Sequence, residues 1–350
     1  MYNDFEIEWG YTPKKQVDYA TELPDVDLTK GLFWLGPDIQ DRDAKHDTDA
    51  DEFGKGHPYT TKQRLLSWDN KVPRHFKGTA EAIGFITAFA SGACVSTQPN
   101  LPGNPLVYSH AITPATFAST KDMVVTTIVE KLAGVRTRKV PSIAVADFTL
   151  SGEGVQYIDL QANLVGSGKQ ATFAGSMPTP VEGNFLWTVG LELEWSRYAN
   201  PLAAISAQLK KWSFAWDNAP RLDDGYFPGS GFVTAGVPSS GAIRGRLERG
   251  TPKMTLSLTF RAEDDSVLTD WEENVEMKAR ITATGEVITV GQPETYQMIL
   301  DLYKFKIKKP QVVFVDGVMC YQITTEVMYD SVAAKPWLLT VVNKDTGYML

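Results

Sequence analysis

Side chains that could do chemistry are few in this chain and widely separated. The four histidines are His46, His57, His75 and His110. None stands four residues from another and none adjoins a cysteine, so the spacing predicts neither a zinc site nor a histidine-based relay. The sequence also contains no Walker loop, no Gly-x-Gly-x-x-Gly and no Gly-x-Ser-x-Gly. These observations argue against an enzyme and predict no cofactor and no catalytic residues.

Two pairs of adjacent carboxylates could in principle act as the acid and base of a glycosidase. They are Asp223 with Asp224 and Glu272 with Glu273. The second pair has a structural explanation, because Thr269 and Glu272 form a Thr-x-x-Glu capping box that predicts the start of a helix. We therefore assign neither pair to catalysis.

An acidic stretch at residues 38–52 could suggest a calcium loop. Its acidic members are Asp38, Asp41, Asp43, Asp47, Asp49, Asp51 and Glu52. A calcium loop that began at Asp47 would need glycine at the sixth position and glutamate at the twelfth, where this chain has Glu52 and Pro58. The stretch is therefore predicted to be an acidic surface hairpin or loop, without a metal.

Composition places the chain among ordinary globular proteins. Of its 350 residues 43% are hydrophobic and 22% charged, and the net charge is −8. No apolar run approaches 18 residues, and the acidic start MYNDFEIEWG is unlike a signal peptide, so we expect synthesis in a cytoplasm and no membrane partner. The negative charge argues against a sequence-independent grip on nucleic acid. Two cysteines, Cys94 and Cys320, are too few for a disulfide framework and are expected to be free thiols.

Period-two alternation of apolar and polar residues dominates the chain and predicts half-buried antiparallel strands. The clearest stretches are residues 158–164, 191–195, 212–216, 254–260 and 321–329. The predicted fold class is therefore mainly β.

Helices are predicted in only a few places. Thr79 precedes the apolar segment AEAIGFITAFAS and Gly92 follows it, which gives an N-cap and a C-terminal glycine. A second helix is predicted to begin at Thr269, with Lys278 and Arg280 near its C-terminal end. A third could occupy residues 201–211 between the two halves of the chain.

The order of these signals repeats. A strand, a helix and a hairpin entered by proline occur within residues 62–165 and again within residues 253–329. The first copy is longer, and residues 95–121, which carry four prolines, are interpreted as an inserted loop. The pattern predicts two duplicated domains, residues 1–200 and 201–350.

Three segments of the first half read GTAEAIGFITAFASGA, YSHAITP and KLAGVRTRKVPSIAVADFTLSGEGVQYIDLQANLVGSGK. Three segments of the second half read RGRLERGTPKMTLSLTFRAEDDS, QITTEVMYDS and VVNKDTGY. In these segments the sequence resembles the tail tube, or major tail, proteins of long-tailed, non-contractile phages. The resemblance spans most of the chain but depends on pattern rather than on a chemical motif.

This resemblance implies a fold and an assembly. Each duplicated domain would be a β-sandwich or split barrel with a flanking helix, and the inner sheets of several copies would join into a ring. Because one chain carries two such domains, a trimer with pseudo-sixfold symmetry is favoured over a true hexamer. The rings would stack into the tail tube of the virion, with the tape measure, tail terminator and distal tail proteins as further partners. DNA would pass through the lumen without specific binding.

The resemblance also suggests which residues make contacts between rings. A long loop or arm is expected at the acidic residues 38–52, with a second-copy counterpart at residues 223–241 that contains Asp223, Asp224, Tyr226 and Phe227. An acidic wall would repel DNA over a short range, since salt screens charges over roughly 8 Å. Two alternatives stay open: a baseplate or capsid accessory protein, and a soluble carbohydrate-binding β-sandwich that uses Trp212, Trp216, Tyr226 and Phe227 as a stacking platform.

Overall fold

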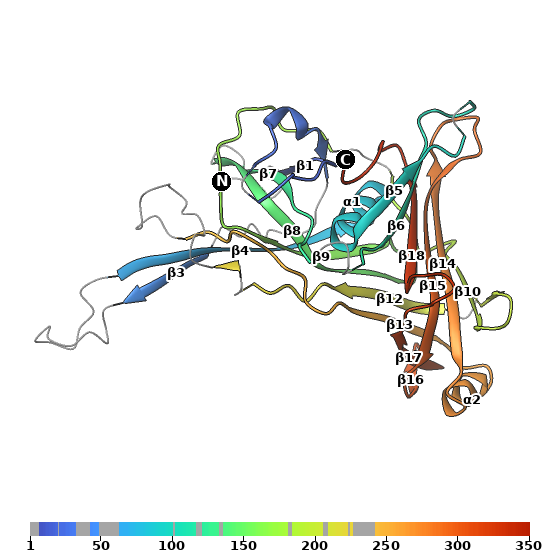
Figure 1. Ribbon diagram of the computed structural model, residues 1–350. Helices are drawn as coiled ribbons and strands as arrows, with labels where there is room; N and C mark the ends of the chain where they lie inside the picture. The colour runs from blue at the N-terminus through green and yellow to red at the C-terminus, as the bar shows by residue number, and fades with distance from the viewer. Residues whose placement is uncertain are drawn as a thin grey trace, which may run out of the picture.

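The computed structural model of the protein describes residues 7–19, 21–32, 43–48, 63–100, 102–116, 121–132, 136–180, 184–205, 209–222, 225–226 and 242–350. The fold is mainly β, as the alternation predicted, and Figure 1 shows its arrangement. The strands of the first half are β1 (Ile7–Tyr11), β2 (Lys30–Gly31), β3 (Asp43–Thr48), β4 (Gln63–Lys77), β5 (Gly92–Thr97), β6 (Tyr108–Pro114), β7 (Thr126–Leu132), β8 (Arg136–Glu153), β9 (Asp159–Gly166) and β10 (Glu192–Arg197). Those of the second half are β11 (Ala203–Ala204), β12 (Leu209–Asp217), β13 (Lys253–Arg261), β14 (Glu276–Val287), β15 (Thr295–Ile307), β16 (Gln311–Val315), β17 (Val318–Val327) and β18 (Trp337–Asn343).

Seven strands form one continuous antiparallel layer, which we call the long layer. Its order is β4, β9, β8, β12, β13, β17 and β16. The strand β3 pairs with the N-terminal part of β4, and β7 pairs with the N-terminal part of β8 and carries β1 and β2 beyond it. Alternate side chains of these strands are buried, which is the burial pattern of a sheet with one covered face.

A second layer runs in the order β5, β6, β18, β15, β14, β10 and β11. It is linked to the long layer where the end of β15 pairs with the end of β17. Figure 1 shows this layer standing at the right of the molecule, across the end of the long layer. The C-terminal strand β18 joins strands from the two halves of the chain, because it pairs with β6 on one side and with β15 on the other.

Helix α1 (Ala80–Ser91) lies against both layers, and all twelve of its residues are buried. It begins and ends as the sequence predicted. The Thr79 hydroxyl accepts a hydrogen bond from the Ala82 amide at 3.1 Å, and Gly92 ends the helix in the left-handed conformation with φ 84°. Aromatic contacts join the layers beside it: the Trp337 ring lies 5.5 Å from that of Phe214.

The second predicted helix is displaced from its predicted start. Helix α2 spans Ser266–Glu272, so Thr269 lies inside the helix, and the expected capping box at this position is wrong. The Asp264 carboxylate accepts a hydrogen bond from the Ser266 amide at 3.0 Å, which starts the helix earlier. Lys278 and Arg280 belong to strand β14 instead of the end of the helix.

Two further predictions are corrected. No helix forms in the described part of residues 201–211, where the short strand β11 and the start of β12 lie instead. Residues 95–121 are more than an inserted loop, because they contain β6 and the second half of β5. The start of β12 and the strand β6 each pair with a strand distant in sequence, β8 and β18 respectively, and this pairing overrides the local propensity of the sequence.

Two groups of three strands within the long layer share one pairing order. The first trio is β4, β9 and β8, and the second trio is β13, β17 and β16. In each, the first strand is followed along the chain by a helix, and a hairpin supplies the other two strands. Gly154 and Gly317 lie in the turns of these hairpins with φ of 56° and 76°. The two trios are joined through β12, which pairs with both β8 and β13.

Candidate assembly surfaces

A β arm projects from the body of the molecule. Strand β3 pairs antiparallel with residues 63–69 of β4, and in Figure 1 this pair extends away to the left. The predicted acidic hairpin or loop is therefore a strand over residues 43–48. Asp43 and Asp47 lie in β3, whereas Asp38, Asp41, Asp49, Asp51 and Glu52 lie outside the described residues.

The base of the arm is held by a buried arginine. Arg244 is only 1% exposed, and its Nη1 lies 2.6 Å from Asp69 Oδ1 on β4. Burial alone would raise the pKa of Asp69, but the hydrogen bond and positive charge of Arg244 outweigh it and lower that pKa. The base of the arm is therefore held by the ion pair of Arg244 and Asp69, whose opposite charges neutralise each other.

Tyr226 belongs to the same arrangement. Its hydroxyl donates to the Trp68 carbonyl oxygen of β4, and the Arg244 guanidinium lies 4.9 Å from its ring centroid. The ammonium of Lys45 on β3 lies 5.9 Å from the same centroid. Of the second-copy loop predicted from the sequence, Tyr226 thus contacts the base of the first arm, whereas Asp223, Asp224 and Phe227 lie outside the described residues.

The two trios are joined by a fully covered row of side chains. Across the long layer Phe76, Leu160, Leu150 and Phe214 lie directly opposite one another on β4, β9, β8 and β12. All four are completely buried. We call the pairing of β8 with β12 the internal seam. It places apolar side chains of both halves of the chain in one core.

The corresponding row of the second trio is open at its end. Phe260, Tyr321 and Val312 lie opposite one another on β13, β17 and β16. Phe260 and Tyr321 are buried, but Val312 is 53% exposed. Phe314, on the same face of β16, is 73% exposed, and Met319 opposite it is 43% exposed. Among the described strands β16 pairs only with β17, so we call its other side the open edge.

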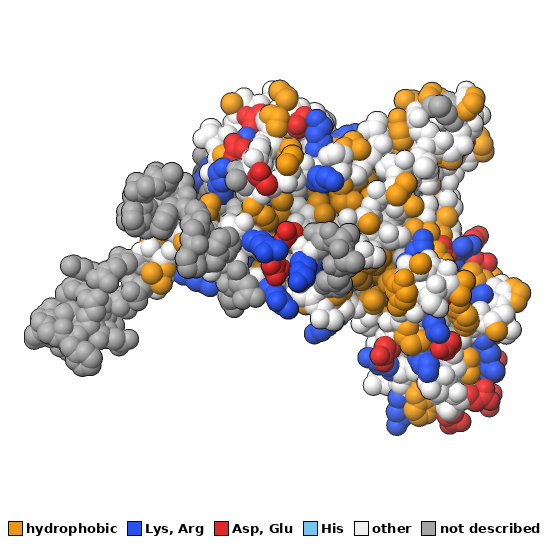
Figure 2. All heavy atoms as spheres, viewed as in Figure 1, with side chains coloured by type: hydrophobic (Ala, Val, Ile, Leu, Met, Phe, Trp, Pro, Cys, Tyr) orange, Lys and Arg blue, Asp and Glu red, His pale blue; other side chains and the backbone are white. Residues whose placement is uncertain are grey.

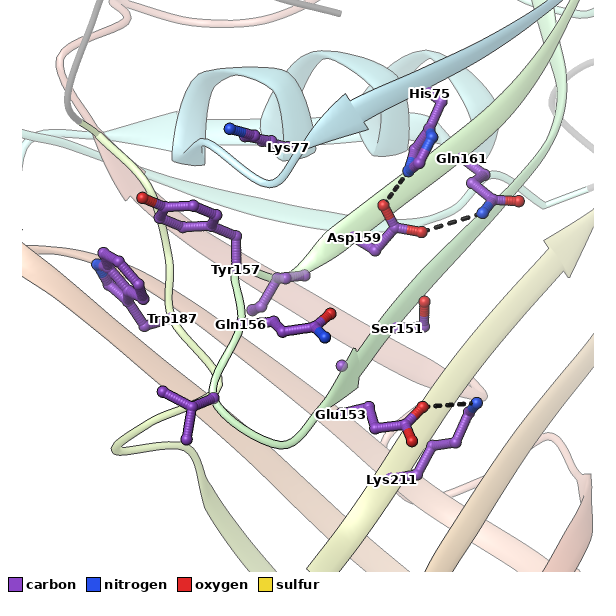
Figure 3. Close-up of a pocket in the computed structure, with 13 residues that line it drawn as sticks. His75, Lys77, Ser151, Glu153, Gln156, Tyr157, Asp159, Gln161, Trp187 and Lys211 are labelled. Atoms are coloured by element: carbon purple, nitrogen blue, oxygen red, sulfur yellow. Dashed lines mark hydrogen bonds and ion pairs between the residues drawn. The ribbon is translucent and has the colours of Figure 1, made fainter. Parts of the chain in front are cut away.

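A groove of about 730 Å³ lies on the polar face of the long layer, at the β8–β9 turn. Figure 3 shows its lining. The Tyr157 and Trp187 rings lie 4.1 Å apart at one side, and Lys77 lies over the Tyr157 ring at 5.2 Å from its centroid. At the other side Lys211 Nζ lies 2.9 Å from Glu153 Oε2, across the internal seam.

The groove does not assemble a nucleophile with a base. His75 contacts the Asp159 carboxylate, and Gln161 donates to the other oxygen of that carboxylate at 3.0 Å. In Figure 3 Ser151 lies apart from the His75 ring, so the arrangement needed for hydroxyl activation is missing there. His75 instead pairs with Asp159, and Lys211 pairs with Glu153.

A buried acidic cluster lies at the start of α1. Asp345 is paired with Lys30 at 2.7 Å and accepts a hydrogen bond from the Tyr348 hydroxyl at 2.8 Å. Glu81 accepts from Asn184 at 2.7 Å. Burial, together with the negative charge of Asp345, raises the pKa of Glu81 to about 7. The cluster connects Lys30, from the N-terminal part of the chain, and Asp345 and Tyr348, near the C-terminus, with the start of α1. It was not predicted from the sequence.

The platform suggested for a carbohydrate-binding protein is not present on the surface. Trp212 and Trp216 are 1% and 2% exposed, because β12 turns them toward the core. The Trp216 ring lies 5.4 Å from that of Trp337. Trp212 and Trp216 are therefore core residues, and the carbohydrate-binding alternative loses two of the four residues on which it depended.

The described residues on the face drawn in Figure 2 carry charges of both signs. Figure 2 shows basic and acidic side chains interspersed on the face it draws. No group of three or more potential metal ligands occurs among the residues that the structure describes. In that same part of the chain, neither helix has the length and apolar character needed to cross a membrane. Both cysteines are free, as predicted.

Two comparisons with known proteins, one with family models and one with curated sequences, found nothing similar. No family model fits the chain. No curated protein is significantly similar to it. The functional conclusion therefore depends on the chain's own architecture and on the resemblance described above.

Proposed function

We propose that this protein is the tail tube protein of a long, non-contractile phage tail. Copies of the chain would form rings, the rings would stack into a hollow tube, and DNA would pass through the lumen to the host. The chain would contain two tail-tube-type domains, residues 1–200 and 201–350, and a ring would contain three chains. Assembly would be the activity, with no enzyme function.

One observation carries the proposal: two trios of identical pairing order are joined through β12 in a single layer, and the last strand of that layer has no further partner among the described strands. A sheet that already continues from one trio to the next can continue into another chain by the same kind of contact. Joining in this way removes exposed strand edges, which otherwise promote uncontrolled association.

The arm adds a second element of support. Contacts between stacked rings require a segment that reaches beyond the subunit, and β3 with the N-terminal part of β4 extends in that way. The contacts of Arg244 with Asp69 and Tyr226 at the base of the arm would fix the direction in which the arm extends. The tape measure, tail terminator and distal tail proteins would bind the assembled tube.

Negative-stain microscopy of the purified protein, before and after concentration, tests the proposal. Hollow filaments are expected. Discrete particles without a channel would contradict a tube protein and would favour a baseplate or capsid accessory component. Deletion of residues 40–55 provides a matched variant, which should fold and form rings without stacking them. Normal filaments from this variant would remove the arm from the proposal.

A further inference from the structure

The open edge of β16 has a composition that is unusual for an edge strand. Edge strands of stable monomers commonly carry charged residues, proline or a bulge that discourages pairing. In contrast, residues 312–315 of β16 read Val-Val-Phe-Val, with regular pairing to β17 and no register shift. Val312 lies on the face that is buried in the rest of its row, at Tyr321 and Phe260, and Phe314 lies on the same face of β16. Within the part of the chain that the structure describes, both the strand edge and these side chains therefore lack a cover.

The internal seam shows what kind of cover fits this position. Leu150 occupies in the first trio the place that Val312 occupies in the second, since each stands at the end of an equivalent row. Leu150 is buried because β12 pairs with β8 and places Phe214 beside it. The strand β12 in turn pairs with β13, the first strand of the second trio.

A single chain also presents an open side at the opposite end of the long layer. Between Asn70 and Lys77, β4 is paired with β9 on one side only, as far as the described strands go. The two ends of the layer are different surfaces. Contact between the β16 end of one chain and the β4 end of another would therefore be head to tail, which generates a closed ring or an open filament.

We infer that the open edge of β16, with Val312, Phe314 and Met319, docks against the first trio of a second copy of this chain, on its β3–β4 side, and so forms an intermolecular counterpart of the internal seam. The inference rests on the proposed function and specifies the contact by which it would operate. Each chain contributes one internal seam and one intermolecular seam.

Substitutions on β16 test this seam directly. Val312→Lys and Phe314→Lys place a charge on residues that are already exposed, so the isolated chain should fold and melt as the wild type does. Val290→Lys is the matched control, because Val290 is a 98% exposed valine away from β16. Association of the full chain is measured by native mass spectrometry and light scattering over a concentration series, and the same samples are imaged.

If β16 forms this seam, both β16 variants should raise the dissociation constant for chain association by about tenfold to a hundredfold. The Val290→Lys control should leave it unchanged. In the wild-type assembly, amide hydrogen exchange of residues 311–315 should slow relative to the dissociated chain. Isotope-exchange protection that is unchanged on assembly would contradict edge pairing.

The outcomes separate this seam from the tube proposal. Filaments that form equally well from the β16 variants would overturn the seam and leave the tube intact. Closed rings that depend on Val312 and Phe314 but never stack would support the seam and contradict the tube. Dimers alone would indicate pairing of β16 with its own copy and would overturn the head-to-tail contact. A wild-type chain that stays monomeric at every concentration would overturn the seam.

Discussion

The β8–β9 and β16–β17 hairpins hold equivalent positions in their trios but differ in what lies on their outer side. Leu150 on β8 is covered by β12 and is completely buried. Val312 on β16 ends the equivalent row and is about half exposed. The same local architecture therefore supports a core position in one hairpin and a surface position in the other. The difference shows that burial here depends on the neighbouring strand rather than on the hairpin itself.

The largest expected effect comes from truncating the two row ends in parallel. Leu150→Ala should lower the free energy of unfolding by about 2–5 kcal/mol, because it leaves a cavity in the core. Val312→Ala in the dissociated chain should change it by less than about 0.5 kcal/mol, since the side chain is largely in water. Urea denaturation of both variants measures the contrast, and equal losses would remove the distinction between the covered and open hairpins.

Helix α1, which follows the first strand of the first trio, makes the stability of the protein depend on pH. Helix α1 is buried and carries Glu81, whose pKa is about 7 in the folded protein against an ordinary value near 4.5. The folded state therefore holds this proton over a pH range in which the unfolded chain has lost it, and stability falls as pH rises from about 4.5 to 7.

Glu81→Gln should remove this pH dependence, because the amide stays neutral and keeps an oxygen for Asn184. Near pH 8 the variant should be more stable than the wild type by about 2–3 kcal/mol, and near pH 4 the two should be similar. Thermal unfolding across this pH range gives the measurement. A stability difference that does not vary with pH would contradict a buried, protonated Glu81.

A smaller effect is expected at the hairpin turns. Gly317 and Gly154 both have positive φ, and a Cβ atom on either would contact nothing within 4 Å. Alanine at each position should therefore cost about 1 kcal/mol from backbone strain alone. Only Gly317→Ala should also weaken association, because its turn supports β16. Equal association of both variants would argue against a role for β16 in assembly.

The smallest effect concerns the ion pair across the internal seam. Glu153 and Lys211 are 2.9 Å apart, but both side chains are more than half exposed. Lys211→Ala should change stability by less than about 1 kcal/mol, and the change should shrink with added salt. A larger loss would mean that charge pairing, rather than the apolar row beneath it, stabilises the seam.

Local signals in the sequence predicted much of the fold. Alternation identified β9, β12 and β13, and the Thr79 and Gly92 caps defined α1. These features depend on residues a few positions apart, so they can be recognised from the sequence alone. The start of α2 was predicted at Thr269, but the helix begins at Ser266. The reason is that the Asp264 carboxylate accepts a hydrogen bond from the Ser266 amide, ahead of the expected capping box.

The candidate surfaces were harder to predict, since they depend on contacts between distant residues. Arg244 and Asp69 are separated by most of the first half of the chain, and neither stands in a motif. The open edge also has no local signature, because the Val-Val-Phe-Val run is equally consistent with a buried strand. Only the pairing of β8 with β12, and the lack of a comparable partner for β16 among the described strands, distinguishes the two hairpins.

An electron cryomicroscopy map of the wild-type assembly tests the central claim most directly. The account predicts a wall around a channel in which β16 of each chain lies against the first trio of the next, with Val312 and Phe314 buried as Leu150 is within the chain. A map in which these two side chains remain in solvent, or in which the copies enclose no channel, would contradict it.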